Sequence, residues 1–205
     1  MLKIKTTGGR IAAVYSAAAC KDVRWFLNGA HFERGALDRL IMVATDGYRL
    51  VTVSHGDDKF ESFEGDVRDS VILSFDDDTL RDLRKGANRE AVVEIEVDLT
   101  GAVVKLGDHT SKASVIDGQF PKWRQVIPKA VDLEKTERSA LNGRYLAEIH
   151  KAASMLTGAK NPPLELVTRG SGAAAFRIQG VDEFFGIVMP MPRENEFNPP
   201  SWAAC

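Results

Sequence analysis

The chain has 205 residues, of which 44% are hydrophobic and 27% are charged, and this composition excludes an intrinsically disordered protein. Its formal charge of −2 excludes a uniformly basic nucleic-acid-binding surface, but it leaves the distribution of the charge open. The sequence contains no apolar stretch of about 20 residues and its start lacks the apolar core of a signal peptide, so we expect a cytoplasmic protein without a membrane partner.

The first predicted unit combines one helix with four strands. Residues 2–5 alternate between apolar and polar side chains, as a strand does, and residues 11–18 carry apolar side chains at helical spacing. Three more strands are predicted at residues 26–32, 39–45 and 48–53. The last two are joined by Asp46-Gly47, which favours a tight two-residue hairpin because glycine accepts a positive φ. The unit therefore has the order βαβββ.

The same order begins again at residue 70. Leu80 and Leu83 would face inward from a short helix whose N-cap is Asp76, Asp77 or Asp78. Alternating apolar residues predict the four strands of this second unit at residues 70–75, 93–97, 103–107 and 111–116.

A third unit follows a connector at residues 120–128 that prolines bound at both ends. Its helix carries apolar residues at helical spacing from Leu146 to Leu156, and Gly158 ends it. Its four strands are predicted at residues 137–141, 164–168, 174–179 and 185–189.

These elements predict an α+β protein of three βαβββ units, with the helices on one face of antiparallel sheets. A single unit cannot bury the helix-covered face of its sheet alone, so adjacent units should share a core. Two units complete a compact domain. The third unit is left without a partner.

Basic residues are concentrated in the helical segments. Residues 8–24, 79–90 and 142–160 each contain two more basic than acidic residues, although the whole chain is acidic. Such a helix layer suits sequence-independent contacts with phosphate groups. Surface helices are also enriched in Lys and Arg for solubility alone, so the pattern leaves both interpretations open.

Five stretches resemble, in family order and on matching elements, the bacterial DNA sliding clamps, which are the beta subunits of DNA polymerase III. Residues 22–29 (DVRWFLNG) resemble the start of their middle domain, and residues 43–50 (VATDGYRL) resemble their signature hairpin. Residues 117–128 (DGQFPKWRQVIP) resemble the connector that leaves this domain. Residues 142–146 (NGRYL) and 188–191 (VMPM) resemble the last helix of the third domain and the family's C-terminal end.

The resemblance implies the DNA clamp fold, with one full clamp domain and one half domain. Residues 1–128 resemble the family's middle domain, and residues 129–192 resemble only the second half of its third domain. Residues 193–205 extend as a tail beyond the point where the family ends. We expect Phe197 and Trp202 in this tail to fold back or to dock into a neighbour's pocket.

In this family a ring of such units encircles duplex DNA and tethers DNA polymerase, without catalysis and without a cofactor. The resemblance therefore implies a processivity factor for DNA replication, whose partners are duplex DNA, proteins that carry clamp-binding peptides, and a clamp loader. It also implies a peptide-binding pocket, in which flexible methionines and other apolar residues take up the anchors of a partner. The matching positions here are Leu27, Thr45, Gly47, Tyr48, Arg49, Leu50, Pro121, Val126, Tyr145, Ile187, Met189, Pro190 and Met191.

Leu50, Val126 and Ile187 could equally be ordinary core residues. For DNA, the resemblance points to Trp25 and Phe26 beside Arg24, although Phe26 could also fill a core. Together with the basic helices, the candidate DNA-binding residues are Arg10, Lys21, Arg24, Trp25, Phe26, Arg81, Arg84, Lys85, Arg144 and Lys151.

The sequence departs from the family in its domains and in its pocket. The first domain and the half of the third domain that forms the family's subunit seam are missing. The family's ring contains twelve units, so a tetramer would supply the same number, whereas a dimer would let two orphan third units complete one another. Gln125 stands where the family often has a basic residue, and Tyr48 where histidine is common.

Two other functions are weighed against a DNA-encircling clamp. A clamp-like module that does not encircle DNA could keep the pocket and recruit or compete for clamp partners. An enzyme is disfavoured, because Asp76, Asp77 and Asp78 precede a helix as caps do, and no nucleophile or base accompanies them. The four histidines are scattered and the two cysteines, Cys20 and Cys205, are far apart, so we expect no metal and two free thiols.

Overall fold

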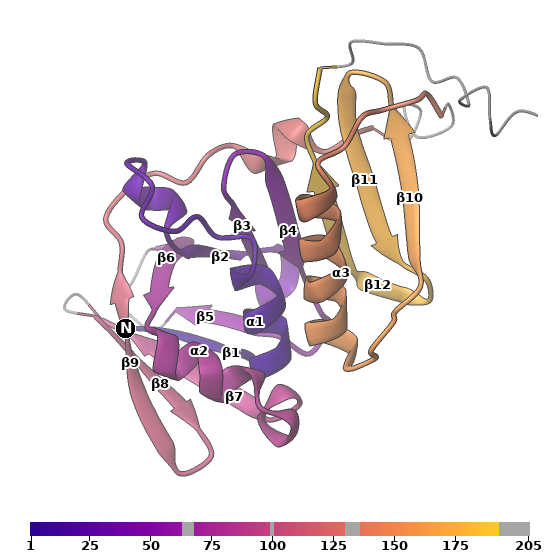
Figure 1. Cartoon of the computed structure of the whole chain (residues 1–205). Helices are drawn as coiled ribbons and strands as arrows, with labels where there is room; N and C mark the ends of the chain where they lie inside the picture. Colours follow the sequence, from indigo (N-terminus) through magenta and orange to yellow (C-terminus); the bar gives the residue numbers. More distant parts are fainter. Residues whose placement is uncertain (63–67, 99–100, 130–135, 193–205) are drawn as a thin grey trace, which may run out of the picture.

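The computed structural model describes residues 1–62, 68–98, 101–129 and 136–192 (Figure 1). Phe197, Trp202 and Cys205 lie outside the described residues, so the expectations about the tail stay predictions. No helix in the described part of the chain is long and apolar enough to cross a membrane.

In the described residues, three α-helices lie on one side of the strands (Figure 1). They are α1 (Gly8–Tyr15), α2 (Asp77–Arg84) and α3 (Gly143–Thr157). Four short 3-10 helices are η1 (Trp25–Leu27), η2 (Ala36–Asp38), η3 (Gly86–Arg89) and η4 (Trp123–Val126). The strands are β1 (Leu2–Thr7), β2 (Ala30–Arg34), β3 (Leu40–Thr45), β4 (Arg49–Val53), β5 (Lys59–Ser62), β6 (Ser70–Phe75), β7 (Val92–Val97), β8 (Ala102–Leu106), β9 (His109–Val115), β10 (Leu164–Arg169), β11 (Gly172–Ile178) and β12 (Val181–Val188).

All of these strands belong to one antiparallel sheet with the order β10-β11-β12-β4-β3-β2-β6-β9-β8-β7-β1-β5. The first two units are interleaved, because β1 pairs with β7 and β6 pairs with β2. The third unit continues the sheet of the first through β12 and β4. The fold is therefore the expected α+β arrangement, with helices on one face of antiparallel strands.

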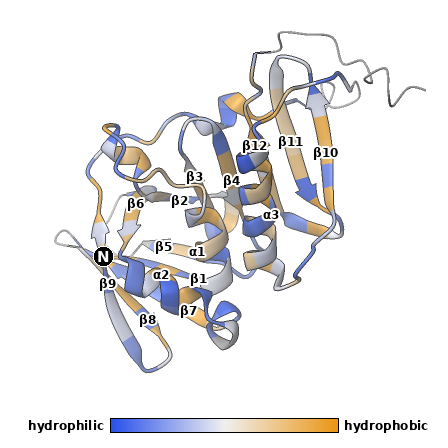
Figure 2. Ribbon diagram, in the orientation of Figure 1, coloured by the Kyte–Doolittle hydropathy of each residue, from blue (hydrophilic) through white to orange (hydrophobic). Residues whose placement is uncertain are grey.

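The two faces of the sheet carry two separate apolar clusters. On β3, Met42 and Ala44 belong to the large core beneath the helices, whereas Val43 belongs to a smaller cluster on the opposite face. Residues 116–127 pack against this smaller cluster, chiefly through Phe120. Figure 2 shows hydrophobic residues along the strands behind α1, while α2 carries hydrophilic residues on its outer side. The alternation of strand side chains thus gives the molecule a helical face and an opposite face.

The helices share one core, as the repeat predicted. Ile11 and Val14 of α1, Leu80 and Leu83 of α2, and Ile149 of α3 are all buried in it. α1 lies between the other two helices and contacts both. The third unit is therefore packed against the first through α3 and α1 and does not stand alone.

The ends of two helices follow the sequence signals. Of the three candidate aspartates it is Asp76 that caps α2, since its carboxylate accepts a hydrogen bond of 2.7 Å from the amide of Thr79. Gly158 ends α3 in the left-handed conformation, with φ of 72°.

Three expectations about elements were wrong, and one strand was not expected. The strand expected at residues 26–32 begins only at Ala30, because residues 25–27 form η1. Residues 46–48 connect β3 and β4, so the turn is longer than two residues. β5, which pairs with β1, was not expected. The strand expected at residues 137–141 is reduced to single bridges of Glu137 with Arg169 and of Ala140 with Met191.

Candidate functional site

The hairpin between β3 and β4 is held by its own side chains. The carboxylate of Asp46 accepts hydrogen bonds from the amides of Tyr48 and Arg49, at 2.9 and 3.0 Å. The hydroxyl of Thr45 accepts from the amide of Gly47 at 3.0 Å and donates to the carbonyl of Arg49 at 2.6 Å. Gly47 has φ of 92°, which other residues rarely adopt. The segment therefore presents a fixed backbone shape.

A pocket of about 390 Å³ opens beside this hairpin. It lies on the face opposite the helices, because its floor is built from Leu27, Leu50 and Ile187 of the smaller apolar cluster. The lining residues are Arg24, Phe26, Leu27, Thr45, Gly47, Tyr48, Arg49, Leu50, Pro121, Lys122, Trp123, Gln125, Val126, Ile187 and Met189.

The floor and the rim of the pocket differ in exposure. Leu50 and Ile187 are almost completely buried, so they serve as core and as pocket floor at once. On the rim, Tyr48 is 60% exposed, Val126 43% and Met189 38%. Exposed apolar side chains over an apolar floor form a surface that can take up the hydrophobic anchors of a peptide.

The structure brings together all the residues expected for the pocket except Tyr145, Pro190 and Met191. Tyr145 lies just outside it and stacks on Tyr48, with ring centroids 6.1 Å apart. Met191 is half exposed and its amide donates to the carbonyl of Ala140 at 2.8 Å.

The sequence reasoning missed four lining residues and named a fifth, Gln125, only as a difference from the family's pocket. Lys122, Trp123 and Gln125 belong to the connector, in which only Pro121 and Val126 were assigned to the list of pocket residues. Arg24 and Phe26 were assigned to DNA instead. Lys122, Trp123 and Gln125 all stand in the connector stretch that resembled the family, so treating that whole stretch as pocket wall would have found them.

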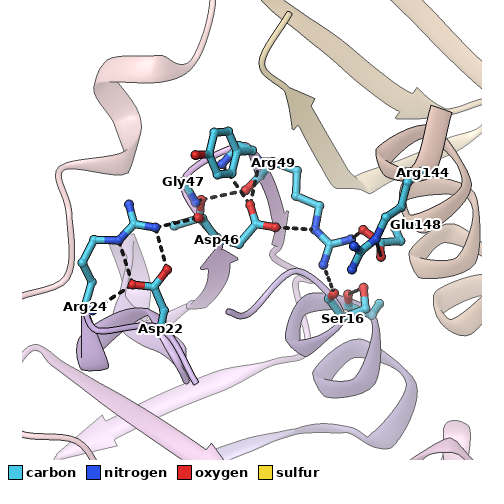
Figure 3. Close-up of polar contacts among 11 residues, drawn as sticks. Ser16, Asp22, Arg24, Asp46, Gly47, Arg49, Arg144 and Glu148 are labelled. Atoms are coloured by element: carbon cyan, nitrogen blue, oxygen red, sulfur yellow. Dashed lines mark hydrogen bonds and ion pairs between the residues drawn. The ribbon is translucent and has the colours of Figure 1, made fainter. Parts of the chain in front are cut away.

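Arg49 links the pocket to the helical face (Figure 3). Its guanidinium pairs with the carboxylates of Asp46, at 3.3 Å, and of Glu148 on α3, and it donates to the carbonyl of Ser16 at 2.8 Å. The ring of Tyr145 lies 5.6 Å from the guanidinium carbon. Burial lowers the pKa of Arg49 below its ordinary value, while the charge of Asp46 opposes this.

Arg24 holds the other side of the hairpin. It makes a two-pronged contact with the carboxylate of Asp22 and donates to the carbonyl of Asp46 at 3.0 Å (Figure 3). The hydrogen bonds from Arg24 lower the pKa of Asp22 to about 2. The positive charge of Arg24 is therefore neutralised within the protein.

The connector is tied to the sheet by a second polar group around Glu33 on β2. The Glu33 carboxylate lies 3.2 Å from Nε2 of His31, accepts from the indole of Trp123 at 3.4 Å, and pairs with Arg124. The ring of His31 stacks on Phe120 at 4.7 Å. Burial would raise the pKa of Glu33, but His31 and Arg124 outweigh it and bring the pKa to about 2. The wall of the pocket that contains Trp123 is thereby fixed.

On the helical face, two adjoining hollows lie between α2 and α3. Arg84 and Lys151 line both, and neither makes an ion pair with any described residue. Lys21 lines the first hollow, and Arg89 and Lys160 line the second. The second hollow, of about 320 Å³, has no acidic residue among its described lining residues.

The expected DNA-binding residues differ in exposure and in ion pairing. Lys21, Arg84 and Lys151 are exposed and make no ion pair with described residues, whereas Trp25 is 59% exposed and donates to the carbonyl of Asp117. Phe26 is partly buried against the smaller apolar cluster, which forms the pocket floor. The exposed residues that are neutralised by a neighbouring carboxylate are Arg24, Arg81, Lys85 and Arg144, which pair with Asp22, Asp78, Asp82 and Glu148.

Arg10 is misplaced in the expected DNA surface. Its side chain is largely buried, and its guanidinium pairs with Asp58 at 3.0 Å and with Glu183 at 3.1 Å. It joins the first unit to β12 and presents no charge to a ligand. Helical spacing alone could not reveal this, because both carboxylates come from distant parts of the chain.

Comparison with known families decides the relationship. The family model described as "DNA polymerase III beta subunit, central domain" matches residues 2–122. The chain belongs to the DNA polymerase III beta subunit family. This match covers both interleaved units and ends at Lys122, within the connector.

Curated members of this family are similar to more than half of the chain. The beta sliding clamp of Escherichia coli K12 is 31% identical over 124 residues, which are 60% of this chain and 31% of that protein. The beta sliding clamp of Proteus mirabilis is 32% identical over 128 residues, which are 58% of this chain and 31% of that protein. The chain thus matches about a third of the length of these relatives.

Solved structures extend the likeness to the third unit. A DNA polymerase sliding clamp from Pseudomonas aeruginosa superimposes with a TM-score of 0.69 at 18% identity, over 94% of this chain and 67% of that one. The beta subunit of DNA polymerase III from Thermotoga maritima gives a TM-score of 0.62 at 16% identity, over 95% and 66%. The fold is therefore the clamp fold of the DNA polymerase III beta subunits.

Proposed function

We propose that this chain is a sliding-clamp-like processivity factor of DNA replication, which binds duplex DNA through its helical face and tethers partners through the pocket. The partners would be DNA polymerase or other proteins with clamp-binding peptides, and a clamp loader, in the cytoplasm and as a homo-oligomer. The proposed role involves no catalysis and no cofactor.

The hollow between α2 and α3 carries the DNA half of the proposal. Arg84, Arg89, Lys151 and Lys160 line it, and among them only Arg89 has an ion-pair partner in the described residues, Glu90 at 2.7 Å. Cations that are already exposed and unpaired can contact phosphates without first breaking an ion pair. Such contacts do not depend on the base sequence, which suits a protein that moves along DNA.

Binding of a duplex oligonucleotide at several salt concentrations tests this half. We expect Lys151→Ala and Arg84→Ala to weaken binding and each to lower the slope of log K against log salt by about 0.9. Lys105→Ala is the matched control, because Lys105 extends from β8 on the opposite face and pairs with Glu96. Equal losses of DNA affinity in all three variants would refute a specific role for the helical face.

The peptide half rests on the pocket itself. A rigid hairpin, an apolar floor and exposed Tyr48, Val126 and Met189 offer both shape and adaptable contact area. A labelled peptide carrying the clamp-binding motif of a bacterial polymerase is the probe. We expect Tyr48→Ala to weaken its binding about tenfold, which corresponds to the loss of a single aromatic contact of an interface.

Val92→Ala is the control for the peptide experiment. Val92 is also an exposed apolar residue, but it lies on β7, outside the pocket. Its substitution should leave the affinity unchanged. A wild-type chain that fails to bind the peptide would argue against the pocket as the partner site.

A second function is favoured by the paired charges of the helical face. Arg81, Lys85 and Arg144 are each neutralised by a carboxylate, which leaves a weaker positive field than the sequence suggested. A clamp-like module that recruits or competes for clamp partners without encircling DNA would need only the pocket. It predicts normal peptide binding together with DNA binding that is weak and insensitive to Lys151→Ala.

A further inference from the structure

The two complete units exchange their first strands. β6 precedes α2 but pairs antiparallel with β2, the first strand after α1. Likewise, β1 precedes α1 but pairs antiparallel with β7, the first strand after α2. Each half of the interleaved sheet thus receives its fourth strand from the other unit, always beside the strand that follows its own helix.

The third unit has a strand and a segment that correspond to the exchanged strands, but in the described residues they do not pair with a strand of another unit in this way. β10 follows α3 and so corresponds to β2 and β7, yet within the described residues β11 is the only strand that pairs with it. The segment before α3, residues 136–142, forms only the single bridges at Glu137 and Ala140. Among the described residues, the unit therefore holds one strand, β10, with a neighbouring strand on one side only, and one segment that joins no strand ladder.

The backbone of β10 is oriented for such pairing. The carbonyl of Pro163 accepts from Gln179 on the β11 side, whereas the carbonyl of Thr168 accepts from Glu137 on the outer side. Because successive residues of a strand point their backbone groups to opposite sides, Leu164 and Leu166 direct theirs outward. The Leu166 side chain, on the helical side of the sheet opposite Phe176, is 45% exposed.

The other end of the sheet is protected in the usual way. In the described part of the chain β5 has four residues, and in it charged Lys59 and Glu61 flank the buried Phe60. Short, charged edge strands discourage the addition of further strands, whereas a longer strand with an exposed leucine invites it. The two edges are therefore not equivalent.

We propose that two copies of this chain form a twofold dimer, in which residues 136–141 of each copy add as an antiparallel strand to β10 of the other. This arrangement is the same kind of strand exchange that joins the first two units within one chain, but here it would occur between two chains. Only a few local bonds, such as those of Glu137 with Thr168, have to open in return for a full strand ladder. The contact is self-complementary and closes at two copies. It does not depend on binding of DNA or of peptide.

Sedimentation velocity of the full chain over a range of concentrations is the first test. We expect the mass of two chains at high concentration. Leu166→Pro removes only an amide that points outward, so it should leave the β11 ladder intact and raise the dissociation constant of the dimer about tenfold or more. Leu166→Lys is the second variant, and thermal melting confirms that both fold.

Glu61→Lys on β5 is the matched control, and it should leave the dimer unchanged. A chain that is monomeric at every concentration overturns the proposal and leaves the edge to residues 193–205 or to another protein. So does a dimer that folded Leu166 variants leave as strong as the wild type.

Cross-linking tests the exchange itself. In the β1–β7 ladder, Thr7 before the helix pairs with Val92 at the start of the strand, and this register places Ala140 opposite Leu166. In chains with Cys20→Ser and Cys205→Ser, a mixture of Ala140→Cys and Leu166→Cys molecules should form a mixed disulfide under mild oxidation. Glu137→Cys should do so with Leu166→Cys if the register follows the β6–β2 ladder, in which Leu73 pairs with Ala30. A dimer that forms neither, or that links Leu166→Cys only to itself, contradicts the exchange.

Discussion

Arg49 on β4 pairs with Glu148 on α3, so a residue of the pocket hairpin is bound directly to a helix of the opposite face. Arg49 also contacts Asp46 and the carbonyl of Ser16 (Figure 3). Its side chain is buried, so this pair joins the first and third units where water is largely excluded.

Removing one partner of this ion pair should lower the stability of the protein. We expect Arg49→Met to lower the free energy of unfolding by about 3 kcal/mol, because Glu148 and Asp46 lose the charge that offsets their desolvation. The double variant Arg49→Met with Glu148→Leu should be less destabilised than the sum of the two single variants. Urea unfolding of the four proteins measures this coupling.

Arg144→Ala serves as the control for that cycle. Arg144 pairs with the same Glu148 but is mostly exposed, so its loss should change stability by at most about 0.5 kcal/mol. A loss as large as that of Arg49→Met would show that burial does not decide the strength of these contacts.

Gly47→Ala should damage the hairpin for two reasons. At φ of 92° any side chain strains the backbone, and a Cβ there would lie 2.8 Å from Nη1 of Arg24. Gly180→Ala has the same kind of backbone conformation, with φ of 75°, but no atom within 4 Å, so it measures the strain alone at about 1 kcal/mol. We expect Gly47→Ala to lose more stability than Gly180→Ala and, unlike it, to weaken peptide binding.

The result is read from thermal unfolding and from the peptide titration. Equal effects of both substitutions would mean that Arg24 moves aside freely. The two-pronged contact of Arg24 with Asp22 would then contribute little to the shape of the hairpin.

Glu33 should make stability depend on pH in the acidic range. Its pKa of about 2 in the folded protein lies below the ordinary 4.5, so its contribution is fully present above about pH 5 and is lost as the pH falls toward 2. A shift of this size is worth roughly 3 kcal/mol. We therefore expect Glu33→Gln to destabilise the protein at pH 7 but much less at pH 3.

Chemical unfolding at both pH values measures this difference. Glu61→Gln, at an exposed carboxylate of β5, is the control and should change stability little at either pH. A Glu33→Gln effect that is the same at pH 3 and pH 7 would show that charge is not what holds the connector.

Ile149→Ala tests whether the third unit folds with the rest. Ile149 is fully buried in the core that α3 shares with α1, so we expect a loss of about 2 to 5 kcal/mol and one cooperative transition. Leu156→Ala, at a partly buried position of the same helix, should cost less. Two separate transitions in calorimetry would contradict a common core.

Much of the fold could be predicted from local patterns. The strand at residues 70–75, the helix that Asp76 caps and the helix that Gly158 ends all follow from spacing and capping chemistry within a few residues. The segment at residues 137–141 has a strand-like sequence as well, but a strand needs a neighbour, and its position in the sheet is not encoded locally.

The same division applies to the candidate site. The resemblance of residues 43–50 and 117–128 to the family predicted most of the pocket, because the hairpin and the connector are continuous stretches. It did not predict that Arg24 would serve the pocket, since the contact of Arg24 with Asp46 crosses from one element to another.

By itself the sequence determined the repeat, the alternation that separates the two faces of the sheet, and the family. All three arise from residues that are close neighbours along the chain. Only the tertiary structure decided which charges remain available. Arg10 and Arg84 look alike in the sequence, but Arg10 is neutralised by Asp58 and Glu183 from distant strands and loops, while Arg84 stays exposed on α2. The free energy of a charge depends on what surrounds it in space, and folding alone brings those surroundings together.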